Sequence, residues 1–402
     1  MIHKEVLSHG LTIIHHPAAF ETVTVEFSVH TGSVAETAAE AGMSHFLEHL
    51  LFEGTKKRPS SKAIANEIEK YGGEFNAATS PERTFFYVKI AKKHFAVALD
   101  ILADMFQHSV FDNAMIEKER KVILEEINLV NDNPRQYQWI LFHKALYGTH
   151  AAAKPVYGNT AALKKMTRQQ ILSYFQRHYV PNNMTITVVG DVPDAVAQIK
   201  RVCSSWERKP LQITVQEMTP NVYSVLKEKK KLSHSYLVLG YKTVLRNHPD
   251  SVVFDVISGI LGRGQSGWLF DEIRAKRGLC YSVGIEYDGS RTYGGVGIYC
   301  GMHKKNISRV QKLILGQLEK LKSVSDAEVS DAKTFVEGAL ALRHENTASF
   351  ADELAYWHFT ASLEAYENYL SALRAVTAAD VQRVVKKYFT DQYTLAVLEQ
   401  EK

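Results

Sequence analysis

Two histidines and a glutamate lie close together near the start of this chain, in the stretch His45-Phe46-Leu47-Glu48-His49. On a helix, His45 and His49 lie one turn apart on the same side, and Glu48 lies beside both. This H-x-x-E-H spacing is the inverse of the H-E-x-x-H zinc helix. Two imidazoles can bind one Zn²⁺, and the adjacent carboxylate can act as a base. The spacing therefore predicts the chemistry of amide hydrolysis, in which a metal acidifies water and a base takes its proton.

The flanking residues predict that the motif is helical. Apolar residues recur at helical spacing and would pack one face on a core: Met43, Phe46, Leu47, Leu50 and Leu51. Gly54 follows this stripe and can end the helix. The alternative interpretation is a helix with two solvated histidines and no metal.

A catalytic zinc ion usually needs a third protein ligand. Residues 116–130, IEKERKVILEEINLV, have helical periodicity, and Glu119 and Glu126 fall in the apolar stripe. Glu125 instead falls on the polar face. Because carboxylates in an apolar stripe are costly unless paired, we expect Glu126 to be a metal ligand and Glu119 to orient a ligating histidine. The alternative is that both pair with basic residues elsewhere.

Together these residues resemble the M16 zinc peptidases, the pitrilysin and mitochondrial processing peptidase family. The segment ERKVILEEI (119–127) resembles the family's third-ligand helix, and GGEFNAATSPERTFFYV (72–88) resembles its active-site edge strand. The likeness covers essentially the whole chain. It implies a zinc metalloendopeptidase with one Zn²⁺ per chain, bound by His45, His49 and Glu126, with Glu48 as general base.

The resemblance also implies how substrate binds. Phe75, Asn76, Ala77 and Ala78 would pair with a peptide backbone by β-augmentation, which requires an extended chain. We therefore expect unfolded peptides or presequence-like segments as substrates.

The second half lacks the zinc motif but has the glycine-rich segment 261–283. We expect a mobile loop there, before a helix. The family has an Arg and a Tyr seven residues apart after such a loop, and Arg274 and Tyr281 match that spacing. Both could donate to a peptide carbonyl or its oxyanion. Alternatively, Arg274 pairs with Asp271 or another acid on its helix, and Tyr281 is half-buried. Three residues depart from the family's small-residue pattern and leave the substrate range open: Arg263, Gln265 and Trp268.

A repeated pattern indicates that the chain contains two copies of one unit. Tyr179 and Thr185 are six residues apart, and so are Tyr388 and Thr394, with a helix before a strand in both cases. We predict an α+β fold of two tandemly duplicated α/β-sandwich domains, the half-shell of an M16 peptidase. The expected boundaries are a catalytic zinc-binding domain at 1–208, a linker at 209–221 and an inactive homologous domain with the substrate-contacting loop at 222–402.

Periodicity predicts the main elements. The expected strands are 23–31, 85–91, 185–189, 235–241 and 294–300. The expected helices are 61–71, 96–106, 168–177, 306–322, 326–343 and 378–388.

Composition excludes several functional classes. The net charge of +4 is too small to argue for nucleic acid binding, and no apolar run is long enough for a membrane span. Three cysteines without C-x-x-C spacing and a start without a signal-peptide pattern favour the cytoplasm. The family's four-domain shell implies a homodimer, or a heterodimer with a paralogous chain. The rival hypothesis is a non-catalytic or partner-dependent assembly subunit, against which the complete set of metal-site residues argues.

Overall fold

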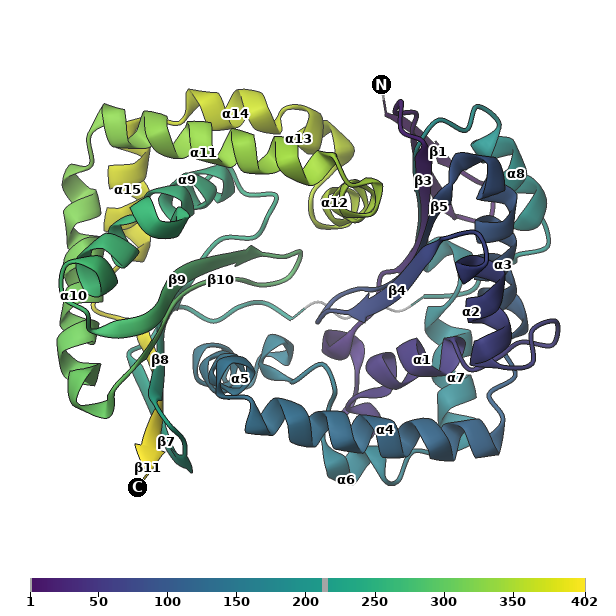
Figure 1. The fold of residues 1–402 in the computed structure, drawn as a ribbon, viewed down its shortest axis with the longest axis horizontal. Helices are drawn as coiled ribbons and strands as arrows, with labels where there is room; N and C mark the ends of the chain where they lie inside the picture. Colours follow the sequence, from purple (N-terminus) through teal and green to yellow (C-terminus); the bar gives the residue numbers. More distant parts are fainter. Residues whose placement is uncertain (1, 212–215, 402) are drawn as a thin grey trace. The chain divides into compact units, whose positions relative to one another are not determined.

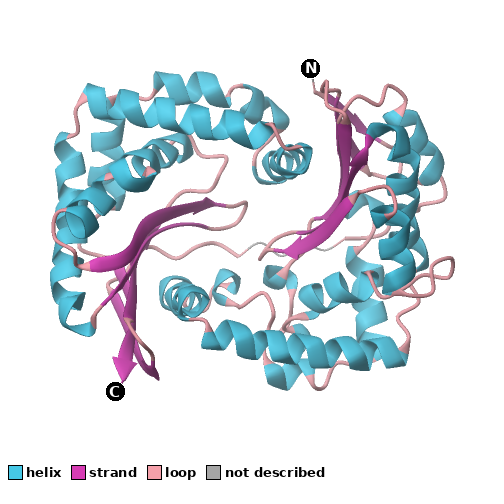
Figure 2. Ribbon diagram, in the orientation of Figure 1, coloured by secondary structure: helices cyan, strands magenta, loops and turns pink. Residues whose placement is uncertain are grey.

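The computed structural model describes residues 2–211 and 216–401. They form two compact units. The first comprises Met1–Asn128, Lys154–Thr214 and Arg343–Phe359, and the second comprises Leu129–Ala153, Val215–Leu342 and Thr360–Lys402. Each unit mixes helices with one sheet (Figure 2), as the α+β prediction requires.

In the described residues of the first unit, one sheet has six strands in the order β1-β2-β6-β3-β5-β4. The strands are β1 (His3–Val6), β2 (Thr12–His16), β3 (Thr22–Val29), β4 (Glu74–Thr79), β5 (Thr84–Ala91) and β6 (Met184–Val189). The helices assigned to this unit are α1 (Met43–Leu51), α2 (Ser61–Glu69), α3 (Phe95–His108), most of α4 (Asn113–Asp132), α6 (Thr160–Leu163), α7 (Arg168–His178), α8 (Ala195–Val202) and α12 (Thr347–Thr360).

In the described residues of the second unit, one sheet has five strands in the order β7-β11-β8-β10-β9. The strands are β7 (Ser224–Lys231), β8 (Ser235–Lys242), β9 (Cys280–Gly289), β10 (Gly294–Met302) and β11 (Thr394–Glu401). The helices are α5 (Pro134–Tyr147), α9 (Ser251–Gly262), α10 (Ile307–Lys320), α11 (Asp326–His344), α13 (Leu363–Glu367), α14 (Tyr369–Ala375) and α15 (Ala378–Tyr388).

The two sheets share one topology. β2 runs parallel to β6, and β7 runs parallel to β11, whereas β3 and β5, like β8 and β10, pair antiparallel. The last strand in each order is the first strand of an antiparallel hairpin, β4 before β5 and β9 before β10. This correspondence supports the predicted duplication.

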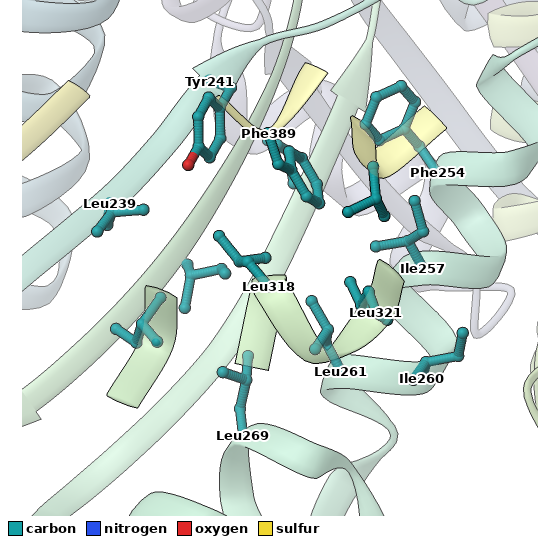
Figure 3. Close-up of a cluster of buried hydrophobic side chains, with 14 of the residues drawn as sticks. Leu239, Tyr241, Phe254, Ile257, Ile260, Leu261, Leu269, Leu318, Leu321 and Phe389 are labelled. Atoms are coloured by element: carbon teal, nitrogen blue, oxygen red, sulfur yellow. The ribbon is translucent and has the colours of Figure 1, made fainter. Parts of the chain in front are cut away.

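Alternation along the strands gives each sheet two different faces. In the first unit, Val23, Val25 and Phe27 of β3 join the core that α3 covers (Figure 1). In the second unit, side chains of α9 such as Phe254 and Ile257 pack in the same core as Leu239 and Tyr241 of β8 (Figure 3). Each sheet thus has one conventional helix-covered face.

The opposite face of each sheet is covered by a helix from the other half of the sequence. In the second unit, Leu141 and Phe142 of α5 pack with Val238 of β8. In the first unit, Thr24 of β3 lies 2.8 Å from Thr347 of α12, measured between their hydroxyl oxygens. The contiguous boundaries 1–208 and 222–402 remain a prediction for the two repeats. The compact units differ from these boundaries, because residues 129–153 belong to the second unit and residues 343–359 belong to the first. Part of the predicted linker, residues 212–215, lies outside the described residues.

Among residues 2–211 and 216–401, no helix has the length and apolarity needed to cross a bilayer. The cysteines at 203, 280 and 300 are all unbridged and buried.

Candidate active site

Helix α1 carries the H-x-x-E-H motif, and its apolar face fixes its position. Met43, Phe46, Leu47 and Leu50 are buried in one cluster with Ile123 and Ile127 of α4. This packing also places the side of α1 that carries His45 and His49 next to α4. The helices predicted around the H-x-x-E-H motif and at 116–130 are both present, as α1 and α4, and they pack together.

The start of α1 is held by a residue that the sequence analysis missed. The Glu36 carboxylate is buried and accepts hydrogen bonds from the backbone N–H groups of Gly42, at 2.7 Å, and Ser44, at 2.8 Å. A carboxylate here satisfies helix-end donors and suits the helix dipole. Gly42 has φ of 95°, and a Cβ atom there would lie 2.5 Å from the Tyr157 carbonyl oxygen. Only glycine fits this turn without strain.

His45, His49 and Glu126 converge as predicted from the sequence. Glu126 Oε2 lies 3.6 Å from His45 Nε2 and 3.5 Å from His49 Nε2. The three donor atoms all lie within 4.8 Å of one another. Two imidazole nitrogens and one carboxylate oxygen form a donor set found in catalytic zinc sites. These residues therefore fit a zinc ion.

Burial distinguishes the two adjacent glutamates of α4. Glu125 is exposed, whereas Glu126 is half-buried beside the histidines. Glu119, two turns earlier, is buried, and its Oε2 lies 3.1 Å from His49 Nδ1. This contact leaves His49 Nε2 turned toward Glu126. His45 Nδ1 has no hydrogen-bond partner among the described residues.

The surroundings shift the pKa values of the two histidines in opposite directions. Burial and the neighbouring His49 lower the pKa of His45 to about 4, although the Glu126 carboxylate opposes this shift. Burial also opposes protonation of His49, but hydrogen bonds to Glu119 and Glu126 outweigh it and raise the pKa to about 9. Without a metal, the His49 ring therefore holds a proton between two carboxylates. A bound cation would replace that positive charge.

Glu48 lies beside this cluster and contacts the sheet. Thr79, the last residue of β4, donates its hydroxyl proton to Glu48 Oε2 at 2.5 Å. Burial raises the pKa of Glu48, and the Thr79 hydrogen bond partly opposes this rise. A carboxylate with a raised pKa is suited to accept and later release a proton. Sequence reasoning did not identify Thr79, although it directly follows the predicted strand residues 75–78.

Strand β4 ends the strand order of the first sheet and carries the predicted peptide-binding residues. The Phe75 ring points inward and lies 5.5 Å from the Phe52 ring, measured between centroids. Asn76 and Ala78 are exposed, and Ala77 is partly buried between them. Asn76 Oδ1 accepts the N–H of Ala77 at 2.9 Å. A peptide that pairs with this N–H must displace the Asn76 side chain.

Arg274 and Tyr281 belong to the second unit, so their proximity to the histidine cluster stays a prediction. Arg274 lies in a π-helical turn, with its guanidinium 5.0 Å from the centre of the Phe270 ring. Asp271 forms an ion pair with Lys276 at 2.6 Å. Tyr281 is at the start of β9 and is 47% exposed.

The unusual glycine-loop residues make contacts within the second unit. Arg263 lies 3.3 Å from Asp331, and the Lys320 ammonium lies 3.6 Å from the centre of the Trp268 ring. Gln265 lies in a short 3-10 turn, Gly264–Ser266. Their effect on substrate range stays open.

Comparisons with known proteins agree along the whole chain. Residues 12–160 match the family model described as Insulinase (Peptidase family M16), and residues 165–336 match the model described as Peptidase M16 inactive domain. The chain is 30% identical to the "Uncharacterized zinc protease YmxG" of Bacillus subtilis (strain 168), over 99% of this chain and 98% of that protein.

Solved structures show the same fold. A protease from Helicobacter pylori has a TM-score of 0.95 at 24% identity, over 99% of both chains. A Pseudomonas fluorescens protein titled as a peptidase M16 inactive domain has a TM-score of 0.91 at 20% identity, over 100% of this chain and 98% of the other. From the matched family models and the full-length relative, the chain belongs to peptidase family M16.

Proposed function

We propose that this chain is a zinc-dependent endopeptidase that hydrolyses unfolded peptides or presequence-like segments. The observation that carries the proposal is the convergence of the ligand atoms of His45, His49 and Glu126 within 4.8 Å of one another, with Glu48 on the helix that carries both histidines. The name of the relative in Bacillus subtilis, a zinc protease, supports both the metal and the reaction class.

The metal would be held by His45 Nε2, His49 Nε2 and the Glu126 carboxylate. Bound there, Zn²⁺ would polarise the scissile carbonyl and lower the pKa of a water molecule. Glu119 holds His49 through Nδ1, so the ring keeps the orientation that a ligand needs. The pKa of His45, lowered to about 4, keeps this second ring neutral and able to bind a cation at neutral pH.

Glu48 acts as the general base in this proposal. It would take a proton from the attacking water and pass it to the leaving amine nitrogen. Thr79 holds one carboxylate oxygen by its hydrogen bond, so the other oxygen is the one to accept the proton. Glu48 is thereby tied to β4, the strand expected to align the peptide.

Strand β4 supplies the substrate preference. Its place at the end of the sheet among the described residues supports pairing with an added peptide strand. Such pairing needs an extended backbone, which a stably folded domain does not offer. Peptides and unfolded segments should therefore be cleaved, and compact domains should resist.

We further propose that the working site is shared between two identical chains. Arg274 and Tyr281 lie in the unit that lacks the zinc motif, and the family's shell contains two such halves. Closed two-fold pairing would complete the shell, with each zinc-binding unit facing the second unit of its partner. Arg274 and Tyr281 would then donate to the peptide carbonyl or oxyanion at the partner's zinc.

The Glu48→Gln variant tests the proposed reaction. It removes the base and no metal ligand, so zinc content should stay at one per chain while cleavage of a fluorogenic unfolded peptide falls about 10²–10⁴-fold. Glu125→Gln on α4, which changes an exposed carboxylate near the site, is the matched control and should keep both properties. Near-normal turnover of a zinc-loaded Glu48→Gln protein would remove Glu48 from the mechanism. An inactive parent protein with full zinc content would instead favour an assembly subunit.

A further inference from the structure

Two histidines contact Tyr281 within the second unit. The Tyr281 hydroxyl oxygen lies 2.5 Å from His303 Nε2. The His234 ring lies 4.3 Å from the Tyr281 ring, centroid to centroid, at an interplanar angle of 35°. Tyr281 comes from the start of β9, His303 follows β10, and His234 lies in the turn between β7 and β8. Three separate segments thus meet at one phenol.

The local backbone turns His303 toward Tyr281. The pairing of β10 with β9 shifts register between Gly301 and Met302, just before His303. Such an irregularity bends a strand and redirects the side chains that follow it. Gly301 packs closely in this stretch, because a Cβ atom there would lie 2.9 Å from Ser282 Oγ and 3.1 Å from the Tyr236 ring.

These contacts matter because Tyr281 is nearly half-exposed. A tyrosine on a surface can rotate among several side-chain conformers, and a catalytic donor must hold one of them to within a small tolerance. His234 restricts the ring through its face, and His303 restricts the hydroxyl oxygen. The phenol is therefore held in place before any substrate arrives.

A phenol has one proton to donate and lone pairs that can accept. If His303 donates from Nε2–H to the phenol oxygen, the phenol O–H remains available for a peptide oxygen. If Nε2 instead accepts, the phenol proton is engaged within the protein. Donation by His303 is the arrangement compatible with Tyr281 acting on substrate.

From this geometry we infer that His303 is a positioning residue for peptide hydrolysis, which donates a hydrogen bond to Tyr281 and directs its O–H toward the oxyanion of the substrate. His234 supports the same orientation by packing on the ring. The inference rests on the proposed function, specifically on the role of Tyr281 as a donor.

A double-mutant cycle between Tyr281 and His303 tests the inference on the full-length, zinc-loaded protein. His303→Ala should lower kcat about tenfold or more for an unfolded peptide and change KM less than about twofold, because the lost interaction strengthens only in the transition state. His303→Gln keeps a donor near the Nε2 position and should restore most of kcat. In a Tyr281→Phe background, His303→Ala should cause no further loss.

Lys304→Ala is the matched control in the same turn, because Lys304 pairs with Glu399, at 2.6 Å, instead of Tyr281. It should leave kcat unchanged. Zinc content and the melting temperature show whether each variant is folded, and His303→Gln provides the comparison if His303→Ala is unstable.

The possible results distinguish the role of His303 from the peptidase reaction itself. If the fold reductions in kcat of Tyr281→Phe and His303→Ala multiply in the double variant, His303 does not act by positioning Tyr281. Normal kcat in both folded His303 variants would also overturn the positioning role. If Tyr281→Phe alone retains full activity, the donor role of Tyr281 and the inference both fail, while the zinc peptidase reaction itself still stands.

Discussion

Glu26 is a charged residue in the middle of β3, and its burial predicts a stability that depends on pH. The side chain is fully buried on the face that α12 covers. Its Oε1 accepts from Ser28 at 2.6 Å and lies 3.3 Å from Arg83 Nη1, while Oε2 has no hydrogen-bond partner in the described part of the chain. Burial, reinforced by Asp352, raises the pKa of Glu26 to about 8, although Arg83 and Ser28 oppose the rise.

The sign and size of the effect follow from proton linkage. An ordinary glutamate pKa of 4.5 applies to the unfolded chain, so between pH 4.5 and about 8 the folded protein binds the extra proton. Its stability therefore falls as pH rises through this window, by about 1.4 kcal/mol per pH unit for one proton. Between pH 5 and pH 7.5 the loss from Glu26 is roughly 3 kcal/mol on this basis.

Glu26→Gln should remove this loss, because glutamine resembles the protonated acid. The variant should match the parent at pH 5 and be more stable by roughly 3 kcal/mol at pH 7.5. Hydrogen exchange of β3 and α12 amides reports local opening without assuming that the whole chain unfolds in one step. At pH 7.5, these amides should be protected from exchange roughly a hundredfold more strongly in the Glu26→Gln variant than in the parent protein.

Glu21→Gln is the control, since the Glu21 side chain is 93% exposed just before β3. It should not change protection at either pH. A Glu26→Gln effect of equal size at pH 5 and pH 7.5 would refute the explanation by charge burial. Lower protection at pH 7.5 would show that the ionised carboxylate stabilises this face.

Three further predictions concern the candidate site. Glu126→Gln should lose zinc strongly during dialysis and Glu125→Gln should not, as metal analysis can show; equal loss from both would contradict the assignment of the ligand. Thr79→Val removes a hydrogen bond that lowers the pKa of Glu48, so the acid limb of the kcat/KM profile should move to higher pH, while Thr79→Ser keeps it in place. An unmoved limb in Thr79→Val would show that Thr79 does not tune the base. Mixing Glu48→Gln chains with Tyr281→Phe chains should restore activity after subunit exchange, because one site per mixed dimer regains both residues. If exchange is demonstrated and activity stays at the level of the separate variants, the shared-site model is wrong.

Local periodicity was enough to predict the centre of the candidate site. The repeat of apolar residues in α4 predicted which of two adjacent glutamates faces inward, and Glu126 is less exposed than Glu125 as expected. The same rule placed Glu119 toward α1, where it contacts His49. Both inferences depend only on positions within one helix, where a residue's place in the sequence determines the face on which its side chain lies.

Other parts of the fold could not be predicted because they depend on distant partners. Helices α5 and α12 were not among the predicted elements, and each buries a face on the sheet of the other repeat. Glu36 has no local helix-capping pattern, since it lies six positions before Gly42 in the sequence. Glu26 breaks the apolar pattern of a buried strand, and only its surroundings in the folded chain, Ser28 and Arg83, explain how it is accommodated.

The exchange of α5 and α12 has a consequence for how the protein is synthesised. The segment that completes the first unit, Arg343–Phe359, follows residues Val215–Leu342 of the second unit in the sequence. While the chain emerges from the ribosome, β3 therefore keeps Thr24 and Glu26 uncovered until residues 343–359 have been made. Helix α5 emerges early and must wait for the strands on which it packs. The nascent chain thus cannot finish its first unit before it has made much of its second.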